Sequence, residues 1–124
     1  MKLFLLLSGF SVLTLSASDC NYKKPAEKYK GRLEIAGICM NYTIRITEGT
    51  IDTAKVSANW TDEVTNKSYT NVFRLDSPCD FPSTIQQGDE FYFIIDTAQP
   101  KECMVCMAYY PTPPRSLNIK VVEK

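Results

Sequence analysis

A Cys-x-x-Cys motif, Cys103-Met104-Val105-Cys106, is the spacing in this sequence that most directly suggests chemistry. Two cysteines at this spacing form a redox pair when a lowered thiol pKa makes one of them a nucleophile. The motif is also half of a zinc site when two more thiolates join it, and Cys39 and Cys79 are available for that role. Export favours a third interpretation, in which all four cysteines are half-cystines of structural disulfides. This interpretation predicts neither a metal nor a cofactor, and it leaves the pairing of the cysteines open.

A fifth cysteine, Cys20, makes the number of thiols odd. This cysteine stays free, pairs with another chain or is modified. Its position after an apolar N-terminal run resembles that of the lipidated cysteine in bacterial lipoproteins. We therefore expect contact with a membrane only if Cys20 is lipidated.

Histidine is absent from the sequence, which removes Ser–His and Cys–His nucleophile systems and His-ligated metal sites. The carboxylates lie singly or in turn-like pairs such as Asp62-Glu63, where solvation explains them better than acid–base catalysis. We therefore predict that the chain is not an enzyme. Its 14 basic and 14 acidic residues give a formal net charge of zero, which offers no electrostatic basis for a nucleic acid partner.

The N-terminal residues predict export. Lys2 precedes a short apolar run, and Ser16-Ala17-Ser18 supplies small residues for cleavage before Asp19, so residues 1–18 are predicted to be a signal peptide. Residues 19–30 show no periodicity and are predicted to form an extended arm. Residues 31–124 are then a single β-domain of a secreted protein, periplasmic or extracellular.

The segment from Gly31 to Thr47 has the clearest strand pattern. Apolar residues alternate with polar ones along it, and the alternation changes phase at Gly37. A β-bulge has this effect, because one extra residue turns every later side chain to the other face. We predict one long, bent strand with a bulge at Gly37.

Further strands are predicted from shorter patterns. Their ranges are 53–61, 68–75, 91–95, 103–110 and 116–122. Residues 76–88 contain Pro78 and Pro82 and are predicted to be irregular, with one helical turn at most. A bent first strand, a meander and a late strand after Gly88-Asp89 resemble an OB-type β-barrel, small and partly open. The alternative all-β fold is an immunoglobulin-like β-sandwich.

Three sequons and one aromatic segment are candidate surface sites. The sequons place glycan acceptors at Asn41, Asn59 and Asn66, which the strand pattern puts on outward faces or in a turn. Tyr109, Tyr110 and Pro111 form a candidate binding rim, because aromatic rings beside prolines can contact a sugar or a peptide.

These features predict a secreted, disulfide-stabilised, non-enzymatic domain that binds a protein, peptide or glycan of unknown identity. An N-terminal arm anchored by a cysteine on an OB-type barrel also resembles the netrin/TIMP family of protease inhibitors, and this resemblance implies protease inhibition as an alternative. A thiol-disulfide or zinc protein that uses Cys103 and Cys106 is the remaining alternative.

Overall fold

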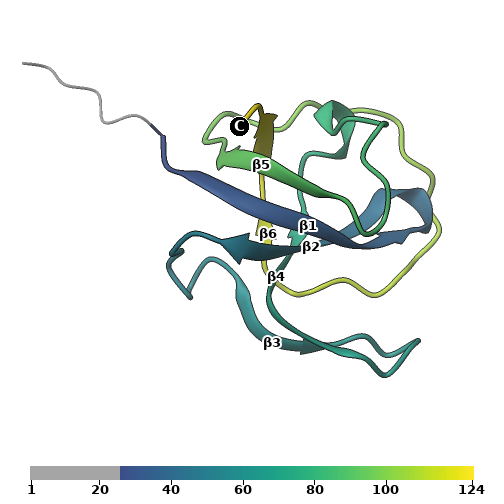
Figure 1. The fold of residues 1–124 in the computed structure, drawn as a ribbon. Helices are drawn as coiled ribbons and strands as arrows, with labels where there is room; N and C mark the ends of the chain where they lie inside the picture. The colour runs from purple at the N-terminus through teal and green to yellow at the C-terminus, as the bar shows by residue number, and fades with distance from the viewer. Residues whose placement is uncertain (1–25) are drawn as a thin grey trace, which may run out of the picture.

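The computed structural model describes residues 26–124, so the predicted signal peptide and Cys20 lie outside the described residues. Nearly all of the regular secondary structure of the described chain is β-strand (Figure 1). The elements in chain order are β1 (Lys28–Gly37), the short 3-10 helix η1 (Ile38–Met40), β2 (Asn41–Glu48), β3 (Ser57–Thr61), β4 (Ser68–Leu75), the short 3-10 helix η2 (Pro78–Asp80), β5 (Glu90–Ile95), β6 (Ser116–Leu117) and β7 (Ile119–Val122). The all-β prediction is confirmed.

The first two strands correct one prediction. Residues 31–47 form a hairpin and not one bent strand, because β1 and β2 pair antiparallel down to the closing pair Gly37 and Asn41. Cys39 has φ 58° and ψ 35°, a left-handed conformation that closes the three-residue turn. The phase change at Gly37 therefore marks a chain reversal. The register shifts that make β1 irregular lie earlier, between Lys30 and Gly31 and between Leu33 and Ile35.

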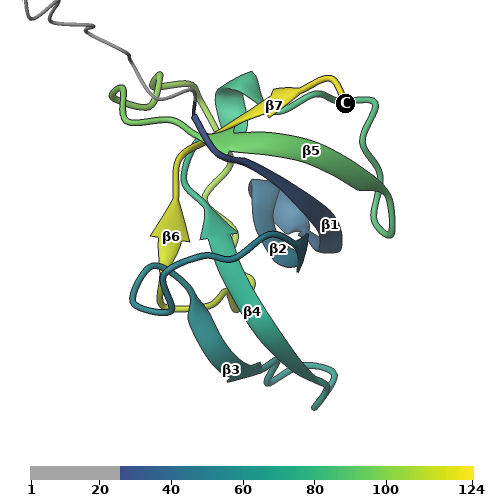
Figure 2. The ribbon, with the colours of Figure 1, turned by 60° about the vertical axis from the view of Figure 1, so that its left-hand side comes forward.

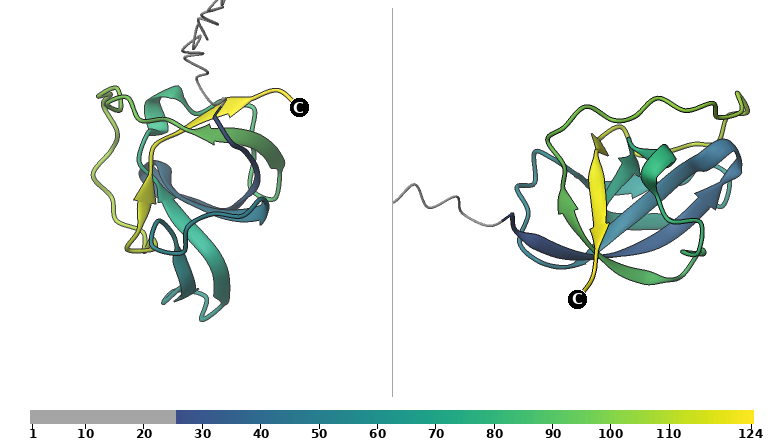
Figure 3. Two further views of the ribbon diagram at one scale, coloured as in Figure 1. Left: turned by 90° about the vertical axis from the view of Figure 1, so that its left-hand side faces the viewer. Right: turned by 90° about the horizontal axis from the view of Figure 1, so that it is seen from above.

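The sheet curls into a partly open barrel. Its strand order is β3-β4-β2-β1-β5-β7, and β6 pairs with β4 in parallel. Only Asn118 separates β6 from β7, so the last strands of the chain span the distance between β4 and β5. Figure 2 shows β6 beside β4 and β7 beside β5, and Figure 3 shows the curved ring from two further directions. One curled sheet, with β1 shared between β2 and β5, favours the OB-like barrel over two stacked sheets.

Aromatic and branched aliphatic side chains fill the barrel. Gly31 is required here, because a Cβ at this position would lie 2.8 Å from Phe93 Cε1. Phe93 contacts the rings of Phe73 and Phe91 at centroid distances of 5.8 and 5.9 Å. The buried cluster consists of Tyr29, Leu33, Ile44, Ile46, Val56, Phe73, Leu75, Phe81, Phe91, Phe93 and Ile119.

Several predicted strand boundaries differ from the structure. The predicted strand 53–61 is shortened to β3, because residues 53–56 form a turn. The range 68–75 is confirmed as β4, although Asn71 adopts φ 53°, so Val72 and Phe73 are both buried despite being adjacent. The predicted strand 103–110 is wrong, because residues 96–115 form a loop without regular structure.

Candidate binding surface

Two disulfides connect the long loop, residues 96–115, to the two short helices. Cys106 is bonded to Cys39 in η1, with their Cα atoms 5.0 Å apart, and Cys103 is bonded to Cys79 in η2, with 5.7 Å between Cα atoms. The prediction that these four cysteines are half-cystines is confirmed. Because the two cysteines of the Cys-x-x-Cys motif bond to different elements, they form neither a redox pair nor a set of zinc thiolates. Within residues 26–124, no group of three or more His, Cys, Asp or Glu side chains could hold a metal ion.

The same bonds hold residues 103–110, which form no strand, against the two short helices. Cys103 and Cys106 are only three residues apart, and each is attached to a different helix. The segment between the two attachments makes no pairing with any strand of the described sheet. Pro111 and Pro113 are buried just after this segment, and proline lacks the N–H that a central strand needs.

The loop presents apolar side chains to solvent. Met104 and Met107 are almost fully exposed, and Tyr109 is 80% exposed. The large hydrophobic side chains that are exposed among the described residues are Ile38, Val64, Met104, Val105, Met107 and Tyr109. We call these residues the apolar rim. They come from η1, the β3–β4 turn and the long loop; in Figure 1, η1 and the tip of the β3–β4 turn lie on the right, and the long loop runs over the top and down the right side.

Specific contacts join the three turns. The Cys39–Cys106 disulfide joins η1 to the long loop. Asn41 Nδ2 donates hydrogen bonds to Ile38 O at 2.7 Å and to Ala108 O at 3.0 Å. The rim therefore has covalent and hydrogen-bonded support behind its exposed side chains.

Asp62 fastens the long loop to the β3–β4 turn. Its carboxylate is fully buried and accepts hydrogen bonds from Tyr110 Oη at 2.7 Å, Val64 N at 2.9 Å and Thr65 Oγ1 at 3.1 Å. Burial alone would raise the pKa of Asp62, but these hydrogen bonds outweigh it and hold the pKa of the carboxyl below its usual range. The hydrogen bond to Asp62 in turn raises the pKa of Tyr110, and desolvation adds to this rise.

The predicted rim residues occupy three different environments. Tyr109 is exposed, whereas Tyr110 is partly buried and directs its hydroxyl to Asp62. A Cβ placed on Gly37 would lie 3.0 Å from Tyr110 Cγ, so the Tyr110 ring lies close against this glycine. Pro111 is buried and contributes no exposed surface. Of the three predicted residues, Tyr109 alone belongs to the apolar rim.

The sequons also differ in their surroundings. Both hydrogens of the Asn41 amide are used in the two hydrogen bonds described above. Asn59 and Asn66 are exposed, and Asn66 has φ 61° in the β3–β4 turn. Asn59 and Asn66 are therefore the sterically open acceptors.

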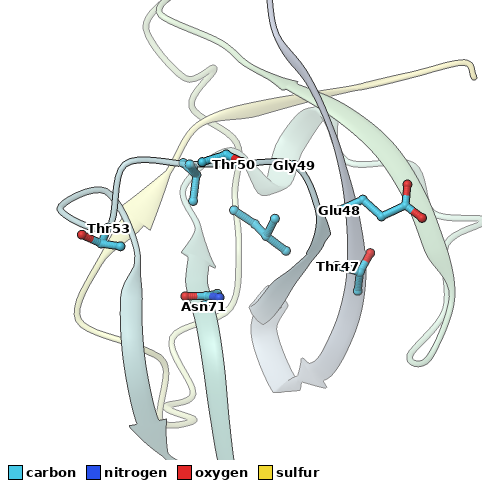
Figure 4. Close-up of a pocket in the computed structure, with 8 residues that line it drawn as sticks. Thr47, Glu48, Gly49, Thr50, Thr53 and Asn71 are labelled. Atoms are coloured by element: carbon cyan, nitrogen blue, oxygen red, sulfur yellow. The ribbon is translucent and has the colours of Figure 1, made fainter.

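A cavity of about 310 Å³ lies between the end of β2, the loop after it and β4. Thr50, Thr53 and Asn71 surround it in Figure 4, whereas the Glu48 carboxylate points away. Glu48 pairs with Lys30 at 3.7 Å. The lining thus offers hydroxyl and amide groups and no free charge, so we assign this cavity no chemistry. A larger open cavity of about 490 Å³ lies beside the Cys79–Cys103 disulfide, lined in part by Gln99 and Lys101.

Comparison with known proteins does not assign the chain to a family. No protein-family model, curated protein or solved structure matches it. In the described part of the chain, neither short helix has the length and apolar character needed to cross a membrane.

Most of the rim was not predicted from the sequence. Ile38 was placed on the inner face by the alternation pattern, yet it is 60% exposed. Met104 and Met107 were assigned to a strand. One signal was available: residues 103–114 contain no charged side chain and end in a proline-rich stretch, Pro111 to Pro114. An uncharged loop that also lacks strand pairing is a candidate contact surface.

Proposed function

We propose that this protein is a secreted, non-enzymatic interaction domain that binds a partner protein through the apolar rim. The observation that carries the proposal is the gathering of the exposed large hydrophobic side chains on three turns that are fastened to one another. Exposed apolar groups on a monomer are usually scattered, and apolar groups on segments that are fastened together are a candidate interaction site.

The composition of the rim supports a protein partner. Protein interfaces are enriched in methionine and aromatic residues and depleted of lysine and glutamate at their centres. The rim contains Met104, Met107 and Tyr109, and residues 103–114 carry no charge. A surface that binds anionic lipid headgroups would instead need lysine or arginine beside the apolar residues.

The contacts behind the rim support binding with little loss of conformational freedom. A loop that is ordered only on binding weakens the affinity by the free energy of ordering it. Here a disulfide and the bonds to Asp62 and Asn41 hold the turns before any partner arrives. Methionine side chains on this fixed backbone can still adapt to the shape of a partner.

The bonded state of the cysteines supports a structural role and an oxidising location. Disulfides are typical of secreted proteins. A thiol-disulfide enzyme would need a thiolate at Cys103 or Cys106, and both sulfurs are bonded to cysteines elsewhere in the chain. Protease inhibition through an N-terminal arm stays a prediction, because Cys20 lies outside the described residues.

Site-specific photo-crosslinking in the native host tests the proposal. A benzophenone amino acid replaces Met107 in one variant and Lys120, an exposed residue on β7, in the control. We expect a discrete crosslinked protein from position 107, none from position 120, and loss of the crosslink when Met104→Ser is added. Equal crosslinking at both positions, or none at position 107, would contradict the proposal.

A further inference from the structure

The outward face of the β1–β2 hairpin carries two opposed cations. Arg32 and Arg45 are direct partners in the antiparallel register. Like charges at directly opposed positions destabilise a sheet. The pair therefore needs negative charge nearby.

Glu34 provides only part of that charge. Its Oε1 lies 2.9 Å from Arg45 Nε and 3.9 Å from Arg32 Nε, and its side chain is only 11% exposed. Both Nε atoms are buried, and neither makes a well-directed hydrogen bond. One carboxylate thus lies within 4 Å of two guanidinium groups, while Glu90, which is opposite Arg32 on β5, pairs with Lys30 at 3.2 Å.

Lys67 is a third cation close to Arg32 and Arg45. Arg32, Arg45 and Lys67 line an open cleft of about 260 Å³, together with the hydroxyl-bearing residues Ser68 and Thr70. The arginine side chains are 43% and 37% exposed, so their outer nitrogens are accessible from the cleft. Three cations and one carboxylate therefore surround a space large enough for a small polar group.

The wall of the cleft is held in place by aromatic packing. Tyr69 lines the cleft and stacks on Trp60, with ring centroids 6.0 Å apart. Lys67 Nζ lies 5.4 Å from the centroid of the Tyr69 ring. This contact places the Lys67 ammonium beside the cleft, where it adds to the positive potential.

We propose that this cleft binds an oxyanion, namely a carboxylate, sulfate or phosphate group. Guanidinium groups present parallel N–H donors that match the paired oxygens of such groups. A bound oxyanion would neutralise the opposed arginines that Glu34 shares. The cleft shares no residue with the apolar rim, although Lys67 lies in the same β3–β4 turn as Val64, so anion binding and the proposed protein contact are tested separately.

Titration of the folded, disulfide-bonded protein with sodium sulfate, phosphate and acetate at constant ionic strength tests this inference. Changes in the NMR chemical shifts of the protein, or the heats measured by isothermal titration calorimetry, give the Kd of each anion. We expect saturable binding, weakened about tenfold by Arg45→Gln and less by Lys67→Gln. Arg74→Gln is the matched control, because Arg74 lies on β4 outside the cleft and faces Asp76 at 4.0 Å.

The variant Glu34→Gln should change the affinity for the anion in the opposite direction. It removes the carboxylate that competes for both guanidinium groups, so the anion should bind several-fold more tightly. A sulfated disaccharide, compared with inorganic sulfate, distinguishes a group carried on a larger ligand from a free anion. Absence of saturable binding by every anion, or equal weakening by Arg45→Gln and Arg74→Gln, would overturn the inference.

Discussion

The buried carboxylate of Asp62 allows a quantitative test of how the apolar rim is supported. The variant Asp62→Ala removes three hydrogen bonds, from Tyr110 Oη, Val64 N and Thr65 Oγ1. Hydrogen bonds to a charged group contribute about 1.5–3 kcal/mol each, and relief of the buried charge offsets part of their sum. We expect the free energy of unfolding to fall by about 3 kcal/mol at pH 6.

A matched control, Asp52→Ala, separates the contribution of the local turn to stability from that of the buried hydrogen bonds of Asp62. Asp52 accepts a hydrogen bond from Ala54 N at 3.0 Å, the same i to i+2 arrangement that Asp62 makes with Val64, but Asp52 is exposed and bonds no tyrosine. Asp52→Ala should lower the free energy of unfolding by about 1 kcal/mol or less. Urea denaturation followed by far-UV circular dichroism measures both variants.

The contribution of Asp62 to the free energy of unfolding changes with pH in a defined direction. Because the folded pKa of Asp62 is lowered, its stabilising contribution is complete above the ordinary carboxyl pKa of about 4 and is lost as the pH falls through the folded pKa. The difference between wild type and Asp62→Ala should therefore narrow on acidification below about pH 4. Tyr110→Phe should also lose its effect in the Asp62→Ala background. A difference that widens at low pH would refute the reasoning, since it would show that burial raises the pKa of Asp62.

Three further predictions follow from the same geometry. Replacing both Cys39 and Cys106 by serine should lower the free energy of unfolding by about 4 kcal/mol, since their sequence separation is 67 residues, and an unchanged urea midpoint would refute this. Gly37→Ala should destabilise the fold by about 1–3 kcal/mol because its Cβ would lie 2.6 Å from Asn41 O, as thermal unfolding would show. In a glycosylating host, peptide mass spectrometry should find glycan on Asn59 and none on Asn41, whose amide is engaged; full occupancy at Asn41 would contradict the structure.

The parts of the fold that could be predicted are the strands whose formation depends on residues close to one another in the sequence. The range of β4 was predicted at both ends, and the apolar run from Phe91 to Ile95 is contained in β5. Alternation of side chains and flanking turn residues specify such strands. The four half-cystines followed from residue type and the expectation of export, without knowledge of their partners.

The hairpin was not predicted, because a bulge and a tight turn produce the same pattern in the sequence. A bulge and a tight turn both change the phase of alternation at Gly37. What distinguishes them is the left-handed backbone of Cys39, which no residue preference announces, because glycine and not cysteine favours that conformation.

The rim was missed because it depends on contacts between segments distant in sequence. The pairing of Cys39 with Cys106 and of Asp62 with Tyr110 spans 67 and 48 residues. These contacts hold residues 96–115 against η1 and the β3–β4 turn. The exposure of Met107 follows from that arrangement and from no feature of its immediate neighbours.

The central claim is that the four cysteines are structural and fix the apolar rim. Peptide mapping of the unreduced protein, purified from its native host with free thiols blocked at lysis, tests it most directly. The structure predicts two crosslinked peptide pairs, Cys39 with Cys106 and Cys79 with Cys103. A bond between Cys103 and Cys106, or blocked free thiols at these positions, would contradict a structural role for these cysteines and would favour redox or metal chemistry.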